Sequence, residues 1–239
     1  MMRSIGVVVA LALFAAAGAA QGQDSTAFRR RILLEARVGT TEMLGDPGRT
    51  LIGPDDAIGV AAAVQLSPKF AAWLNTDFRP SNSSKLYPGP GLSPAVSMLA
   101  LTAGVSRAFG PPLGRLQWRP IEVGLGAGAT RTTVEWRGYN DVTEPPPGAQ
   151  VEDPRAAGLL SSARWRPTAA ARLRFAVPLG SVVLSATAAL LATRVGDVPL
   201  WNGQWEPTDD PSRYRAGRQT WRYGTTIMTP LTVGLGLAF

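Results

Sequence analysis

The stretch LTVGLGLAF, residues 231–239, ends the chain with large apolar residues at every second position. Thr232, two glycines and Ala238 occupy the positions between them. Alternation with a period of two is typical of a β-strand, because successive side chains of a strand point to opposite faces. The stretch therefore predicts a strand with one apolar face and one face of small residues.

Seven segments upstream show related alternation, namely residues 32–39, 59–66, 70–79, 95–107, 121–130, 168–177 and 182–194. All except 95–107 and 182–194 alternate cleanly, and their apolar faces contain no charged residue. The opposite faces carry Glu35, Arg37, Asp77, Arg79, Glu122, Arg172 and Arg174. An arginine that faces hydrocarbon at the midplane of a membrane costs about 2–4 kcal/mol. This exclusion predicts that the apolar faces meet lipid and that the charges point into the lumen of a barrel.

The connections between these segments are alternately short and long. Short links lie at residues 67–69, 110–115 and 178–181. Long links rich in Pro, Gly, Asn, Asp and Ser, which predict loops, lie at roughly 44–57, 80–94, 137–162 and 195–220. Short turns at one end and long loops at the other are typical of outer-membrane barrels. We predict an all-β fold: an eight-stranded antiparallel up-and-down transmembrane β-barrel with short periplasmic turns and long extracellular loops.

The composition excludes several classes of protein. The 239 residues contain no Cys and no His, which excludes disulfide bonds, cysteine zinc sites and a lipidated N-terminal cysteine. Basic residues outnumber acidic residues by 24 to 17, but the excess is not clustered as in a nucleic-acid-binding surface. We therefore expect no nucleic-acid partner.

The N-terminus has the features of a secretory signal. Arg3 precedes an apolar run at residues 5–17, which is too short to span a bilayer comfortably as a helix, and small residues follow the run. We predict a cleaved signal peptide at residues 1–20, a linker at 21–30 and the barrel domain at 31–239.

Four residues of the last predicted strand resemble the assembly signal of bacterial outer-membrane β-barrels. They are the polar Thr232, Gly234 two positions later, and the hydrophobic Leu237 and Phe239 at the third-last and last positions. Residues 32–239 thus resemble the small eight-stranded outer-membrane proteins of Gram-negative bacteria, of the outer membrane protein A, X and W types. The resemblance implies periplasmic chaperones and the barrel-assembly machinery as partners during biogenesis. It also implies that outer-membrane lipid and lipopolysaccharide surround the mature protein.

The inward charges are the main candidates for a specific site. Glu122 is expected to neighbour Arg172 and Arg174 on the adjacent strand. Glu35 and Arg37, on the first strand, complete the predicted ion-pair network. We expect this network to fill the lumen, because the interior of an eight-stranded barrel is just wide enough for side chains. The same arginines could alternatively line a narrow conduit that prefers anions.

Catalytic and cofactor sites are not expected. Without His, a serine nucleophile would need a lysine base, and Lys69 and Lys85 lie in a predicted turn and a predicted loop, where neither is buried. The G-x-G-x-x-A pattern at residues 124–129 resembles a nucleotide-binding turn, but β-branched residues follow it instead of a helix. Acidic residues at 141–153 lack the spacing of a calcium loop. We expect no enzyme activity, no cofactor and no metal.

The last long connection combines Trp201 and Trp205 with Asp and Arg residues. It could bind glycans, lipopolysaccharide phosphates or a host surface, or form a solvated loop with interfacial aromatic residues. We predict a non-enzymatic integral protein of the cell outer membrane that supports envelope integrity or surface interaction. The alternatives are a narrow, porin-like channel for small hydrophobic or anionic solutes and a soluble periplasmic lipid-binding barrel.

Overall fold

The computed structural model describes residues 31–44, 52–80, 94–113, 119–136, 143–222 and 224–239. The predicted signal peptide and linker lie outside these residues. The strands are β1 (Ile32–Leu44), β2 (Ile52–Ser67), β3 (Phe70–Arg79), β4 (Pro94–Phe109), β5 (Ile121–Trp136), β6 (Gln150–Val151), β7 (Ser161–Leu179), β8 (Val182–Arg194), β9 (Asp197–Pro207), β10 (Arg213–Arg222) and β11 (Thr225–Ala238). None of the described residues belongs to a helix that is long and apolar enough to cross a membrane.

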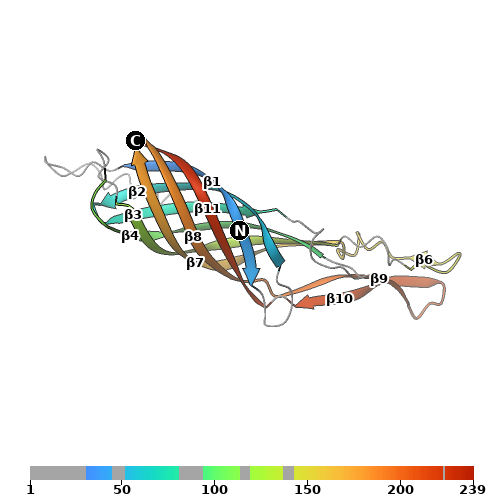
Figure 1. Ribbon diagram of the computed structural model, residues 1–239. Coiled ribbons are helices and arrows are strands. Elements are labelled where there is room, and N and C mark those ends of the chain that lie inside the picture. The colour runs from blue at the N-terminus through green and yellow to red at the C-terminus, as the bar shows by residue number, and fades with distance from the viewer. Residues whose placement is uncertain (1–30, 45–51, 81–93, 114–118, 137–142, 223) are drawn as a thin grey trace.

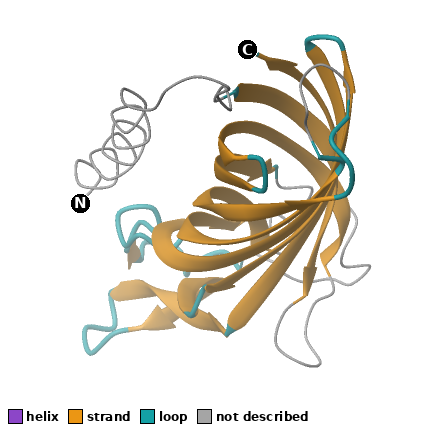
Figure 2. Cartoon of the chain, turned by 90° about the vertical axis from the view of Figure 1, so that its left-hand side faces the viewer, coloured by secondary structure: helices purple, strands orange, loops and turns teal. Residues whose placement is uncertain are grey.

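Eight strands form a closed barrel in the order β1-β11-β8-β7-β5-β4-β3-β2, with every neighbouring pair antiparallel. The wall closes where β1 pairs with β11, from Leu33↔Ala238 to Leu44↔Ile227. Figure 2 shows the strands coiling around this barrel. Each strand thereby has a partner on both sides, which removes the sheet edges. The predicted eight-stranded antiparallel barrel is confirmed.

The fourth long connection is a β-hairpin and not the loop that its composition predicts. β9 and β10 pair from Tyr214↔Pro207 to Arg222↔Asp197, and β6 adds a short parallel strand to β10. This three-stranded sheet projects from one end of the barrel (Figure 1). The prediction was wrong because prolines, glycines and acidic residues suggest turns, whereas the hairpin is stabilised by side chains such as Trp201 that it buries itself. The first long connection is also shorter than predicted, because β2 already begins at Ile52.

The outer wall of the barrel is a band of exposed aliphatic side chains, as the alternation predicts. Leu125 is 72% exposed, whereas Glu122 and Arg174 on the inner face are 1% and 2% exposed. Exposed aromatic side chains occur near both ends of the strands: Phe70, Phe109, Phe175 and Phe239 toward the short turns, and Phe78 and Trp165 toward the long connections. Aromatic rings flank the apolar band of outer-membrane barrels in the same way.

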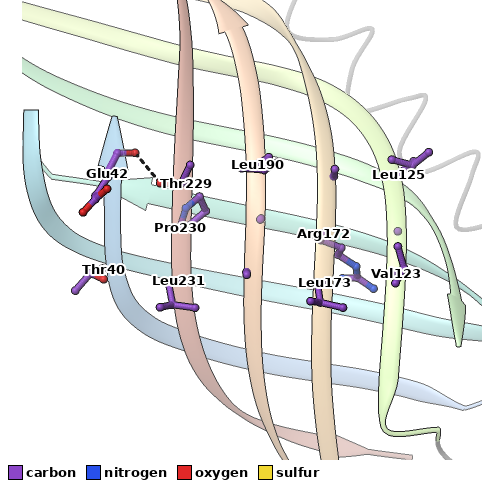
Figure 3. Close-up of a pocket in the computed structure, with 14 residues that line it drawn as sticks. Thr40, Glu42, Val123, Leu125, Arg172, Leu173, Leu190, Thr229, Pro230 and Leu231 are labelled. Carbon is purple, nitrogen blue, oxygen red and sulfur yellow. Dashed lines mark hydrogen bonds between the residues drawn. The ribbon is translucent and has the colours of Figure 1, made fainter. Parts of the chain in front are cut away.

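A shallow hollow of about 630 Å³ lies on this outer wall and extends across β1, β11, β8, β7 and β5 (Figure 3). Its lining includes the large side chains of Leu125, Leu173, Leu190 and Leu231 and the short side chains of Ala171 and Ala188. The hollow arises because alanines alternate with leucines on the same outward face. Its lining belongs mainly to the surface that the sequence predicts to meet lipid.

Glycines of β4 and β5 make room for Trp73 inside the barrel. A Cβ atom added at Gly104, Gly124 or Gly126 would lie 2.6, 2.9 or 2.7 Å from the indole ring. These distances are shorter than van der Waals contact, so a larger residue would collide with the ring. The G-x-G-x-x-A pattern at residues 124–129 is therefore part of strand β5, as predicted, and the glycines serve the packing of Trp73.

Placing an arginine on the outer wall tests the assignment of this face to lipid. Leu125→Arg is expected to lower the free energy of unfolding in lipid vesicles by about 2–4 kcal/mol, because a charge near the midplane loses its hydration. Thr133→Arg, on the same face of β5 but near the strand end, is the matched control and should cost at most about 1 kcal/mol. Chemical denaturation in vesicles measures both values, and equal costs for the two variants would contradict a lipid-facing wall.

Candidate functional site

Glu122 is the centre of an ion-pair cluster in the lumen. It lies directly opposite Arg174 in the pairing of β5 with β7. The two carboxylate oxygens accept from different arginines: Arg174 Nη1 lies 3.0 Å from Oε1, and Arg172 Nη2 lies 3.0 Å from Oε2. All three side chains are buried. Two positive charges thus share one carboxylate, and a second acid is needed to balance them.

Glu35 supplies that second carboxylate from the opposite side of the cluster. Arg174 donates to Glu35 Oε2 through Nη2 at 2.7 Å and through Nε at 3.2 Å. The strands β11 and β8 lie between β1 and β7 in the wall, so this ion pair passes over them. Their inward residues there are small, and a Cβ atom at Gly234 would lie 2.6 Å from Glu35 Oε1 and 2.7 Å from Ser185 Oγ. Gly234 therefore leaves room for the Glu35 carboxylate.

Arg37 belongs to a separate ion pair with Asp77, a residue that the predicted network did not include. Arg37 Nη2 lies 2.8 Å from Asp77 Oδ1, and both side chains are buried. Gly59 of β2 lies between them, since it pairs with Arg37 on one side and with Asp77 on the other. A Cβ atom at Gly59 would lie 2.9 Å from the carboxylate. The alternation of the sequence already placed Asp77 on the inward face of its strand. Its height along the barrel axis, which decides that it meets Arg37, depends on the register of three strands.

Trp73 and Ser106 complete the environment of Arg172. The guanidinium carbon of Arg172 lies 4.5 Å from the centre of the Trp73 ring, which is a cation–π contact. Arg172 Nη2 also lies 3.4 Å from Ser106 Oγ, and this hydroxyl lies 3.3 Å from Glu122 Oε2. The side chain is therefore held by a carboxylate, a ring and a hydroxyl, which fixes its position in the lumen.

Buried side chains fill the lumen on both sides of the ion pairs, and apolar ones lie there together with polar ones such as Gln65, Thr132 and Arg79. Toward the short turns, the buried apolar inward residues are Leu33, Ala176, Val183 and Ala238. Toward the hairpin, they are Val96, Met98, Val134, Leu191 and Met228, joined by Val198 and Leu200 at the base of β9. Leu200 is 0% exposed, and β9 contacts β5 and β7. Sequence reasoning missed Val198 and Leu200 because they lie in the predicted loop, although their alternation was a signal.

Known structures share this architecture. The Ail attachment invasion locus protein of Yersinia pestis superimposes with a TM-score of 0.51 at 9% identity, over 89% of this chain and 100% of that one. A major outer membrane protein of Thermus thermophilus gives a TM-score of 0.50 at 13% identity, over 89% and 100% of the two chains. This chain has the fold of the small eight-stranded outer-membrane β-barrels. The resemblance that the last strand suggests is confirmed at the level of the fold.

These structural similarities show the fold of the chain and do not assign an activity to it. The outer membrane protease OmpT of Escherichia coli also matches, with a TM-score of 0.38 at 10% identity, over 90% of this chain and 100% of that one. No protein-family model matches the sequence, and no curated protein matches it. What this barrel does is therefore argued from its own side chains.

The four residues of the predicted assembly signal divide between the two faces of β11 in the outer-membrane barrel. Thr232 is buried in the lumen, and Gly234 lies under the Glu35 carboxylate. Leu237 and Phe239 point outward and are 50% and 70% exposed. Recognition of these residues during assembly stays a prediction.

The aromatic and charged residues of the β9–β10 hairpin mostly contact one another. Trp201 is buried against Leu159 and Ala216, and its ring centre lies 5.1 Å from that of Trp205. Arg215 lies 3.1 Å from Glu206. Hydrogen bonds from the Ser212 hydroxyl and amide, followed by the charge of Arg213, hold the pKa of Asp210 below its usual range. These contacts stabilise the hairpin itself, which lies outside the barrel wall.

Removing Glu122 tests the lumen cluster. Glu122→Ala is expected to lower the free energy of unfolding by about 3–5 kcal/mol, because it leaves two buried arginines with one carboxylate between them. Glu206→Ala is the matched control: it removes an ion pair with Arg215 whose two side chains are 40% and 62% exposed. That control should cost at most about 1 kcal/mol. Equal costs in denaturant unfolding would show that the lumen pairs are solvated.

Proposed function

We propose that the protein is a non-enzymatic integral outer-membrane barrel with a closed lumen, which supports the envelope and presents the β9–β10 hairpin at the cell surface. The observation that carries this proposal is the layering of the interior. Buried ion pairs occupy one level, and almost fully buried side chains, apolar ones together with threonines and Arg79, fill the lumen above and below them. Such an interior supports the barrel as a solid body in the membrane.

Conduction is disfavoured by the same layers. A channel for small solutes needs open space along the lumen, whereas Leu33 and Val183 at one end and Met98 and Leu200 at the other are each at most 2% exposed. A lipid-binding barrel of the periplasm would need the opposite arrangement, with an apolar interior and a polar exterior. Here the ion pairs are inside, and leucines such as Leu125, Leu190 and Leu235 are outside.

The side chains that the structure describes also favour a role without catalysis. The chain has no His, so a hydrolytic serine would depend on one of two lysines. Lys69 is exposed in the turn between β2 and β3. Lys85 lies outside the described residues. Arg172 and Arg174 are bound to Glu122 and Glu35, an arrangement that stabilises the interior.

Planar-bilayer recording of the purified protein tests the closed lumen. We expect no unitary current, because an ion would have to displace the side chains that fill the lumen and break the ion pairs. The Arg172→Gln variant is expected to show no unitary current either. Unitary currents whose anion selectivity changes in Arg172→Gln would contradict the proposal and establish the narrow channel instead.

Single-cysteine labelling tests whether the hairpin lies at the cell surface. The sequence has no native cysteine, so the introduced cysteine is the only thiol that can react. Asp209→Cys, in the exposed turn between β9 and β10, is expected to react with a membrane-impermeant maleimide on intact cells. Lys69→Cys, in an exposed turn at the other end of the barrel, is the control and should react only after the outer membrane is opened. Labelling of Lys69→Cys but not Asp209→Cys on intact cells would contradict the proposed orientation.

A further inference from the structure

Two pairs of opposite charges lie on the outer wall, near the strand ends on the hairpin side. Glu42 of β1 and Asp56 of β2 are exposed on two strands that pair with each other, and they form an acidic patch. Arg131 of β5 and Arg194 of β8 are exposed on either side of Trp165 of β7, and these three residues form a basic patch. Trp165 pairs directly with Arg131.

The four charges of the two patches have no counter-ion among the residues that the structure describes. None of them takes part in an ion pair there, in contrast to the charges of the lumen cluster. A charge that borders the hydrocarbon region is costly when it has no partner. Both patches therefore favour a counter-charge that another molecule supplies.

The register of the strands places the two patches on opposite sides of the barrel. A path through paired outward residues leaves β7 at Trp165, runs once around the wall and returns to β7 at Phe175, ten residues nearer the short turns. This offset corresponds to a strand tilt of about 40° and a circumference of about 50 Å. Along the unrolled wall, the centres of the patches are then about 25 Å apart, which is half a turn. By the same geometry, all four charges lie within about 8 Å of the level of Trp165, so the two patches are at similar depths in the membrane.

The apolar surfaces below the two patches differ in the size of their side chains. Below the basic patch, Ala103, Ala127 and Ala169 are exposed and lie side by side on β4, β5 and β7. Below the acidic patch, Val38 and Leu231 are 58% and 60% exposed. One surface is thus recessed and the other protrudes. Membrane-spanning segments associate through such van der Waals packing, in which small residues permit close approach.

We propose that the acidic patch of one copy binds the basic patch of a second copy in the same membrane. In this side-by-side arrangement, Glu42 faces Arg194 of the second copy. Asp56 faces Arg131 in the same way, and the protruding valine and leucine pack on the alanines. Because the patches are half a turn apart, the contact is head-to-tail and extends into rows of barrels instead of closing. A lipid phosphate would satisfy only the basic patch, whereas a second copy satisfies both.

Cysteine cross-linking in isolated outer membranes tests the contact, because the sequence has no native cysteine. A chain with both Val38→Cys and Ala127→Cys is expected to form a ladder of disulfide-linked multimers on oxidation. Either cysteine alone should stay monomeric, since a head-to-tail contact joins different residues. The matched control combines Val38→Cys with Leu173→Cys, an exposed position between the two patches on the unrolled wall, and should give no ladder. Absence of the ladder, or an equal ladder from the control, would overturn the contact.

Charge reversal in the double-cysteine chain tests the ion pairs. Glu42→Arg with Asp56→Arg is expected to lower the yield of the ladder at least about tenfold, because like charges then face each other. Arg131→Glu with Arg194→Glu should lower it to a similar extent. All four reversals together are expected to restore the ladder, since opposite charges meet again. An effect of the arginine reversals without any effect of the acidic-patch reversals would overturn the second copy and establish a lipid phosphate as the counter-ion.

Heat-modifiable migration on a gel checks that each variant folds, so that loss of the contact is not confused with loss of the barrel. A folded variant with all four reversals and no ladder would also overturn the proposal. The contact does not depend on the proposed function, because a closed barrel and a channel would have the same outer wall. Unitary currents would contradict the proposed function and leave this contact intact.

Discussion

An open sheet edge cannot lie in hydrocarbon, because unpaired N–H and C=O groups find no water there. In this chain the pairing of β1 with β11 satisfies that constraint and joins the two ends of the barrel domain in sequence. Closure then fixes every other feature: each strand has one face toward lipid and one toward the lumen. The aliphatic band outside and the glutamates and arginines inside are two consequences of the same closed wall.

Small residues on intermediate strands allow the charges inside to meet. The pair of Arg37 with Asp77 passes over Gly59, and the pair of Glu35 with Arg174 passes over Gly234 and Ser185. A β-carbon at either glycine would collide with a carboxylate. Gly59 and Gly234 therefore leave the space that the long side chains of the ion pairs occupy.

Arginines occur in two contrasting environments. Arg37, Arg172 and Arg174 in the lumen are bound by carboxylates and surrounded by buried side chains, which supports a barrel without a path for solutes. Those at the rim, Arg164, Arg166 and Arg194, lie in a cleft without ion-pair partners among the described residues. The first group has its counter-ions within the chain, whereas no counter-ion of the second group lies among the described residues. The interior thus supports stability.

The sequence by itself determined the fold class and the facing of the side chains. A period of two assigns each residue of a strand to one of its two faces, and charge is excluded from the face that meets hydrocarbon. Glu122, Arg172 and Arg174 could therefore be placed in the lumen from their spacing alone. Partners of Glu35 and Arg37 could not be found in this way, because depth depends on strand tilt and register, which no single strand encodes. The hairpin was also missed, since its stability comes from contacts such as those of Trp201 with Leu159 that exist only after distant segments meet. Only the tertiary structure decided which charges pair and what fills the lumen, because each depends on distances across the barrel.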